Sequence, residues 1–206
     1  TKTVINILNK NLKLKSDTAR NFREVTIRRF CTQIFQKRLN SILLDKKSSL
    51  LSGYIGIFNL TLNNEFYYIG AQLKEDVIKE GINILFTEIE RVKQNGFTSK
   101  ELEIEKEKEI LFYEQAIKAK KTRNTGSIVA EYTRNFLENE FVSGEEREYE
   151  LMKQLLPTIS VNDLNNHFLN WLRFDDRIIN IIYPEKIKNI ISKDELLNLE
   201  TKMQKN

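Results

Sequence analysis

The sequence predicts an α+β fold with two layers, in which a small, mostly antiparallel sheet is covered by several helices. Apolar residues alternate with a period of two in several short segments, as they do in strands. In longer segments they recur with the helical period, and capping residues mark where these helices begin. The order is strand, helix, two strands, several helices and a final strand. No internal repeat or low-complexity linker divides the chain, so residues 1–206 are expected to form a single domain.

The individual elements follow from the spacing of apolar residues and from the residues that separate them. A period of two begins at Gly53, and Asn63 with Asn64 marks a turn before the next strand, so a β-hairpin is expected. Tyr67 and Tyr68 alternate on the second of these strands and are expected to pack in the core or across strands. The expected strands are residues 4–8, 53–61, 65–73 and 177–183, and the expected helices are residues 16–44, 77–96, 98–121, 127–139, 143–156, 160–172 and a short one from 192.

The junction between two of these helices is the most informative segment of the chain. Gly96 can adopt the left-handed backbone conformation that ends a helix. Thr98 can accept from the free amides of the next helix while Glu101 bonds back to Thr98, which is the arrangement of a capping box. Pro157 is expected to end another helix. The same capping pattern is expected at three further helix starts: Ser143 with Glu146, Ser160 with Asp163 and Ser192 with Glu195.

Composition argues against several classes of function. The net charge is only +4, from 33 basic and 29 acidic side chains, so no nucleic-acid partner is expected, and a basic RNA-binding module is the weakest alternative. No segment approaches the roughly 20 apolar residues that a membrane-spanning helix needs. Cys31, the only cysteine, is expected in the core. The basic residues of the first long helix are expected on a solvated face: Arg20, Arg23, Arg28, Arg29, Lys37 and Arg38.

The potential metal ligands of the chain do not form a recognisable site. His167 is the only histidine, and it is expected to pack in its helix or to be partly exposed. Five glutamates alternate with lysines along one helix, and they are expected to form a solvated ion-pair face rather than a metal cluster. These glutamates are Glu101, Glu103, Glu105, Glu107 and Glu109. No catalytic residue and no metal ligand is therefore assigned within this chain.

Three segments of the chain carry a family resemblance in their order and spacing. Residues 22–43 contain Arg38-Leu39 before the expected hairpin, and residues 96–110 read GFTSKELEIEKEKEI. Residues 122–172 contain Leu-Pro-Thr-Ile before a helix that ends in Trp-Leu. Together they resemble the second, non-zinc-binding domain of the N-terminal half of the pitrilysin/insulinase family of zinc metallopeptidases.

The resemblance implies a place in a larger protein. Proteins of this family form a chamber from two halves, each with two similar α+β domains of the metallohydrolase-like fold. Zinc is held in the first domain by a His-x-x-Glu-His motif and a further glutamate. This chain lacks that motif, so no cofactor is expected in it, and zinc is expected in the first domain of the parent protein. The arginine of the family's substrate-holding Arg–Tyr pair is also missing from residues 66–76.

Two functions stay open under this resemblance. The chain is expected to be a fragment that serves as a non-catalytic, chamber-forming and substrate-enclosing domain of a zinc-dependent endopeptidase that degrades peptides. The alternative is a domain of a catalytically inactive family member that acts as a scaffold or partner subunit. The expected partners are neighbouring domains of the same polypeptide and a peptide substrate, and the expected location is the bacterial periplasm. The residues expected to line the chamber are Asn59, Thr61 and Gln72.

Overall fold

The structure is a computed structural model that describes residues 2–15, 17–119, 124–138, 144–173, 177–187 and 190–204. The expected strands and helices are present, and the first strand runs on to Leu12 because it pairs with the hairpin along its whole length. In chain order the elements are β1 (Val4–Leu12), α1 (Ala19–Leu43), β2 (Leu50–Asn59), β3 (Asn64–Leu73), α2 (Ile78–Asn95), α3 (Ser99–Ala119), α4 (Thr125–Glu138), α5 (Glu145–Leu155), the 3-10 helix η2 (Leu156–Thr158), α6 (Val161–Trp171), β4 (Arg177–Ile182) and α7 (Lys193–Gln204).

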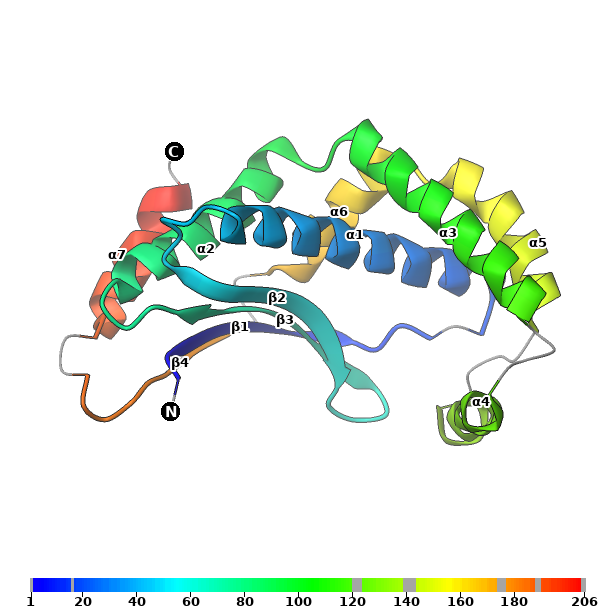
Figure 1. The fold of residues 1–206 in the computed structure, drawn as a ribbon, viewed down its shortest axis with the longest axis horizontal. Helices are drawn as coiled ribbons and strands as arrows, with labels where there is room; N and C mark the ends of the chain where they lie inside the picture. The colour runs from blue at the N-terminus through cyan, green and yellow to red at the C-terminus, as the bar shows by residue number, and fades with distance from the viewer. Residues whose placement is uncertain are drawn as a thin grey trace.

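The four strands form one sheet in the order β2-β3-β1-β4, and all neighbouring strands are antiparallel. Helix α1 and the helices that surround it lie on one side of this sheet, and the other face of the sheet points away from them (Figure 1). The predicted two-layer α+β fold is therefore confirmed. Odd-numbered strand residues such as Ile7, Tyr67 and Ile69 are buried under the helices, whereas their even-numbered neighbours lie on the uncovered face.

Helix α1 lies against the sheet and forms the centre of the helical layer (Figure 1). Its side chains Phe30 and Phe35 are fully buried, and Phe35 packs on Phe168 of α6 with 5.5 Å between the ring centroids. Cys31 is also fully buried, and its thiol donates to the carbonyl of Leu164 at 3.4 Å. Burial raises the pKa of this thiol, so it stays protonated. The prediction that Cys31 is a core residue is confirmed.

The junction between α2 and α3 has the predicted geometry. Gly96 has a φ of 70°, and its N–H closes the last turn of α2. The Glu101 carboxylate accepts from the Thr98 N–H at 2.7 Å, and the Thr98 hydroxyl accepts from the Glu101 N–H at 3.3 Å. Arg38 of α1 holds this junction from the side, because its guanidinium donates to the Gly96 carbonyl at 3.1 Å and to both Glu101 oxygens at 2.8 Å.

The first helix begins at Ala19, after the N-cap Thr18, and not at residue 16 as expected, and the expected end of α3 at residue 121 lies outside the described residues. Pro157 lies in η2, directly after α5 ends. The N-cap of α5 is Gly144, with a φ of 81°, and no side chain caps this helix. Ser143, expected to cap it together with Glu146, lies outside the described residues. The two capping boxes that the structure contains as predicted are Ser160 with Asp163 and Ser192 with Glu195.

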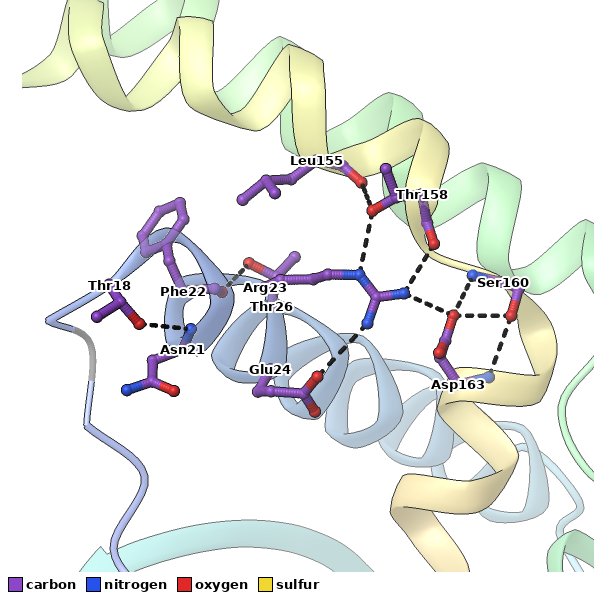
Figure 2. Close-up of polar contacts among 10 residues, drawn as sticks. All are labelled: Thr18, Asn21, Phe22, Arg23, Glu24, Thr26, Leu155, Thr158, Ser160 and Asp163. Atoms are coloured by element: carbon purple, nitrogen blue, oxygen red, sulfur yellow. Dashed lines mark hydrogen bonds and ion pairs between the residues drawn. The ribbon is translucent and has the colours of Figure 1, made fainter.

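Arg23 connects the first turns of α1 to the start of α6 (Figure 2). Its guanidinium donates to the Thr158 hydroxyl at 3.1 Å, to the Thr158 carbonyl at 2.7 Å and to the Asp163 carboxylate at 2.8 Å. Burial alone would raise the pKa of Asp163, but the hydrogen bonds from Ser160 and Arg23 outweigh it and lower that pKa. The same carboxylate therefore caps α6 and ties it to α1.

The expected solvated face of basic residues on α1 is wrong for three of its arginines. The side chains of Arg23, Arg28 and Arg38 are only 21%, 15% and 18% exposed, and each pairs with a carboxylate of another element. Arg29 and Lys37 are more exposed, but both pair with glutamates of α3. The reason is the central position of α1, whose polar side chains meet the surrounding elements before they reach solvent.

The expected solvated face of glutamates on α3 is also wrong in part. Glu105 and Glu109 are only 3% and 6% exposed, because residues four positions apart lie on the same side of a helix and this side faces α1. Lys37 pairs with Glu105, and Arg29 pairs with Glu109. Glu103, which points away from α1, forms the kind of exposed ion pair that was expected, with Lys106 at 3.0 Å.

Candidate functional site

A cavity of about 1010 Å³ opens where the tip of the hairpin faces the beginning of α1 and the end of α3. It is large enough for a small ligand or for several residues of an extended peptide. Both charged and apolar side chains reach it, including those of α5 and one residue of α4. The lining residues are Lys13, Leu14, Lys15, Asp17, Thr18, Ala19, Phe22, Val25, Arg28, Arg29, Asn59, Leu62, Asn63, Glu65, Phe112, Tyr113, Leu137, Arg147, Glu148, Glu150, Leu151 and Gln154.

A buried ion pair forms part of the cavity wall. Glu65, at the start of β3, has a side chain that is 2% exposed, and both of its oxygens accept from Nη1 of Arg28, at 2.7 and 2.8 Å. The pair is polar but carries no net charge of its own. Sequence reasoning did not single out this pair. The available signal was the position of Glu65, which lies on the inward face of a strand otherwise lined by apolar residues.

A second group lies beside this pair, where α1 meets α3. Arg29 pairs with Glu109, and burial raises the pKa of Glu109 even though Arg29 lowers it in part. Tyr113, one helical turn further along α3, is 4% exposed, and burial raises its pKa to about 12. Tyr113 is therefore a neutral hydroxyl group at this wall at neutral pH.

The structure does not bring the three predicted chamber-lining residues together. Asn59 is exposed, ends β2 and lines the cavity on the helix-covered side of the sheet. Thr61 lies in the hairpin turn, where its hydroxyl accepts from the N–H groups of Asn63 and Asn64. Gln72 lies on β3 with its side chain on the opposite, uncovered face, because it shares the even parity of the residues there. Of the three, only Asn59 reaches the cavity.

His167 has the packing role that the sequence predicted. Its ring lies edge-on to Trp171, with 3.5 Å between the ring centroids. Trp171 in turn packs on Tyr67, with 3.8 Å between their ring centroids. Burial lowers the pKa of His167 to about 3, and the nearby charge of Arg28 adds to this effect. The imidazole is therefore neutral at physiological pH and forms part of an aromatic cluster between α6 and the sheet.

The described residues contain neither a metal-binding cluster nor a membrane-spanning helix. Among them, no group of three or more His, Cys, Asp or Glu side chains is placed so that it could hold a metal ion. Within the same ranges, no helix is long and apolar enough to cross a membrane. The cavity wall offers hydrogen bonds, paired charges and apolar contacts to a ligand.

One segment of the chain, residues 16–109, resembles a known protein family. Residues 16–109 match the family model described as the peptidase M16 inactive domain. The matched segment contains α1, the hairpin, α2 and the capped start of α3. Over these 94 of its 206 residues, the chain is similar to a peptidase M16 inactive domain. The resemblance to the non-zinc-binding domain of the pitrilysin/insulinase, or M16, family is thereby confirmed. A search of curated proteins finds no match to the chain.

Solved structures extend the similarity from residues 16–109 to the whole length of this chain. The first half of the periplasmic protease PqqL from Escherichia coli is similar with a TM-score of 0.94 and 17% identity, over 100% of this chain and 45% of that one. The peptidase M16 inactive domain from Pseudomonas fluorescens gives 0.59 and 18%, over 87% and 40%. The ferredoxin protease FusC, in complex with Arabidopsis ferredoxin, gives 0.80 and 14%, over 98% and 23%. At these identities the comparisons establish a shared fold, and this chain spans less than half of each of these M16 structures.

Proposed function

We propose that this chain is a non-catalytic domain that helps to enclose peptide substrates in the chamber of a zinc-dependent endopeptidase. The observation that carries the proposal is the similarity of the entire chain to part of the first half of PqqL, together with the match to the M16 inactive domain. In this proposal zinc is bound by another domain of the parent protein, the neighbouring domains of that polypeptide are the partners, and the location is the bacterial periplasm, as for PqqL.

The cavity beside the hairpin is the surface that we assign to the substrate. Its wall carries Asn59, and the hairpin turn next to it carries Thr61. A paired and therefore neutral Arg28–Glu65 floor suits peptides of varied sequence, because it offers hydrogen bonds without selecting one sign of charge. Gln72 lies on the other, uncovered face of the sheet. A change at Gln72 therefore tests whether that face, and not the cavity, meets the substrate.

The test compares Asn59→Lys with Gln72→Lys in the full-length parent protein. Both changes add one positive charge to the hairpin, but on opposite faces of the sheet. We expect Asn59→Lys to lower kcat/KM for peptide hydrolysis at least about fivefold and Gln72→Lys to leave it within about twofold. Loss of activity only in Gln72→Lys would assign the uncovered face to the chamber instead. A parent protein without bound zinc and without peptidase activity would support the scaffold alternative and refute the enzymatic one.

A further inference from the structure

Strand β2 forms one edge of the sheet, and its own sequence does little to protect that edge. Among the described strands only β3 pairs with β2, so the outer side of this ten-residue strand faces no partner strand. Residues 50–60 contain no charged residue and no proline, which commonly prevent an edge from pairing with another strand. A register irregularity lies between Leu50 and Ser52, at the very start of the strand. The rest of the edge is uncharged and rich in residues that favour strands, so its protection has to come from another element.

Gln36 of α1 occupies the middle of this edge. Its Nε2 donates to the carbonyl of Gly53 at 2.8 Å, and its Oε1 accepts from the N–H of Ile55 at 3.1 Å. An N–H group has a single hydrogen to donate, so the N–H of Ile55 points towards Gln36 and not towards β3. Both bonded groups therefore lie on the outer side of β2, where a further strand, parallel or antiparallel, would have to bond to them. The side-chain amide takes the place of a peptide group of such a strand.

The amide of Gln36 is held in one orientation. Its Nε2 also donates to Oδ1 of Asn40, one helical turn further along α1, at 3.0 Å. A reversed amide would place Nε2 against the N–H of Ile55 and Oε1 against the carbonyl of Gly53, so only one orientation satisfies both groups. Helix α1 runs alongside β2 (Figure 1), and Gly53 permits this close approach, because a Cβ atom there would lie 3.2 Å from Cβ of Leu39.

We propose that Gln36 acts as a built-in plug that closes the edge of β2 to pairing with another extended polypeptide strand. Two successive outward groups near the centre of β2 are already bonded, so an incoming strand meets only short stretches of edge on either side of the plug. Short two-stranded ladders are marginal in water, and a longer ladder requires the Gln36 side chain to leave both of its partners. The group that occupies the edge belongs to this chain itself, so the plug does not depend on any neighbouring domain or second copy.

The first experiment measures hydrogen exchange of the Ile55 amide by NMR. Gln36→Met keeps an unbranched side chain that favours helices but removes both hydrogen bonds to β2, so we expect this amide to exchange at least about tenfold faster. Gln33→Met is the matched control, since it makes the same change at an exposed position of the same helix and should leave the rate within about twofold. Far-UV circular dichroism and the fluorescence of Trp171 confirm that each variant is folded. An unchanged exchange rate in folded Gln36→Met overturns the proposal.

The second experiment tests strand addition directly. The probe is a fluorescent peptide with the sequence of residues 52–60, the β2 segment itself, followed by a solubilising lysine tail. Fluorescence anisotropy measures its binding to the wild-type chain and to both variants. We expect Gln36→Met to bind the peptide at least about tenfold more tightly than the wild type does, and Gln33→Met to bind it as the wild type does. Equal affinities for all three proteins overturn the proposal.

Modified peptides show whether the gain in affinity comes from main-chain pairing. An added strand bonds through the N–H groups on one of its sides, so two peptides that are N-methylated on one or the other set of alternate amides should differ in affinity for Gln36→Met. Equal binding of the two peptides indicates contact through side chains and overturns the proposal.

A second variant covers the case in which Gln36→Met does not fold. At neutral pH the carboxylate of Gln36→Glu cannot donate to the carbonyl of Gly53, so this variant should bind the unmodified peptide at least about threefold more tightly than the wild type does. Binding equal to that of the wild type overturns the proposal. None of these outcomes depends on the proposed peptidase role.

Discussion

Replacement of Arg38 by alanine should destabilise the domain, because this side chain bonds to two other helices at once. The guanidinium makes two hydrogen bonds of 2.8 Å to Glu101 and one of 3.1 Å to the Gly96 carbonyl. It also lies 3.8 Å from Glu88, a carboxylate that is 2% exposed, and 5.4 Å from the centre of the Phe97 ring. One side chain thus holds the end of α2 and the start of α3 against α1.

The size of the effect follows from what the substitution leaves behind. Breaking a buried ion pair costs about 3–5 kcal/mol, because the remaining partner keeps its desolvation cost. Arg38 and Glu101 are 18% and 27% exposed, so water screens part of this loss. Glu88 keeps one partner, Arg91 at 3.1 Å, but its other oxygen stays buried without a hydrogen bond. We therefore expect a loss of about 2–4 kcal/mol in the free energy of unfolding, or roughly 5–15 °C in Tm.

Urea unfolding measures this loss, with far-UV circular dichroism and the fluorescence of Trp171, the only tryptophan, as two independent probes. Arg20→Ala is the matched control, since it removes the same side chain from an exposed position of the same helix and should cost less than about 0.5 kcal/mol. Arg38→Lys should fall between the two, because an ammonium group cannot reproduce the two-pronged contact with Glu101. A cost for Arg38→Ala within about 0.5 kcal/mol of the control would refute this account of the junction.

Three further predictions concern the helix ends and the core. Asp163→Asn should cost about 1–2 kcal/mol at pH 7, and the difference from wild type should shrink as the pH falls below about 4. The reason is that the pKa of Asp163 is lowered in the folded state. Its contribution to the free energy of unfolding is therefore present above the unfolded-state pKa and is lost as the pH falls through the folded-state pKa. Urea titrations at several pH values measure this contribution. Gly96→Ala should cost at least about 1 kcal/mol in the same assay, since φ is 70° and the new Cβ would lie 2.5 Å from the Asn165 amide; a neutral result would contradict this. The Cys31 thiol should react with a thiol reagent only at the rate of unfolding, and fast labelling of the native protein would contradict its burial.

Local chemistry explains why the sequence predicted the elements and their order so well. Gly96 and the Thr98–Glu101 box act within a few residues of one another, so their geometry can be inferred without the rest of the fold. The ion pairs of α1 could not be inferred in this way. Arg28 meets a carboxylate 37 residues away, and Arg23 meets one 140 residues away, so both partners depend on how the layers pack.

The candidate site was predictable only in part, for a related reason. Alternation along the expected strand 53–61 predicted Asn59 and Thr61 on one face, but β2 ends at Asn59 and Thr61 lies in the turn. The position of Gln72 depended on the register across that turn. In the structure Asn59 pairs with Glu65, so residues of equal parity share a face and Gln72 falls opposite to Asn59. The cavity itself lies among β3, α1, α3 and α5, and no single segment of the sequence contains enough of it to indicate a site.

The motifs that carry the M16 resemblance contact one another in space, and this gives them a physical meaning in a chain without a recognisable zinc motif. Arg38 of the first motif bonds to the Gly96–Glu101 junction of the second. In the third motif, the carbonyl of Thr158 and the carboxylate of Asp163 both accept hydrogen bonds from the guanidinium of Arg23 in α1. Each motif is thus one half of a tie between α1 and the outer helices. Ties of this kind fix the orientation of the helical layer on the sheet more than they add to stability, since buried charged pairs cost almost as much desolvation as they return. The proposed role in a chamber wall would require this fixed orientation, whether or not the domain holds a metal.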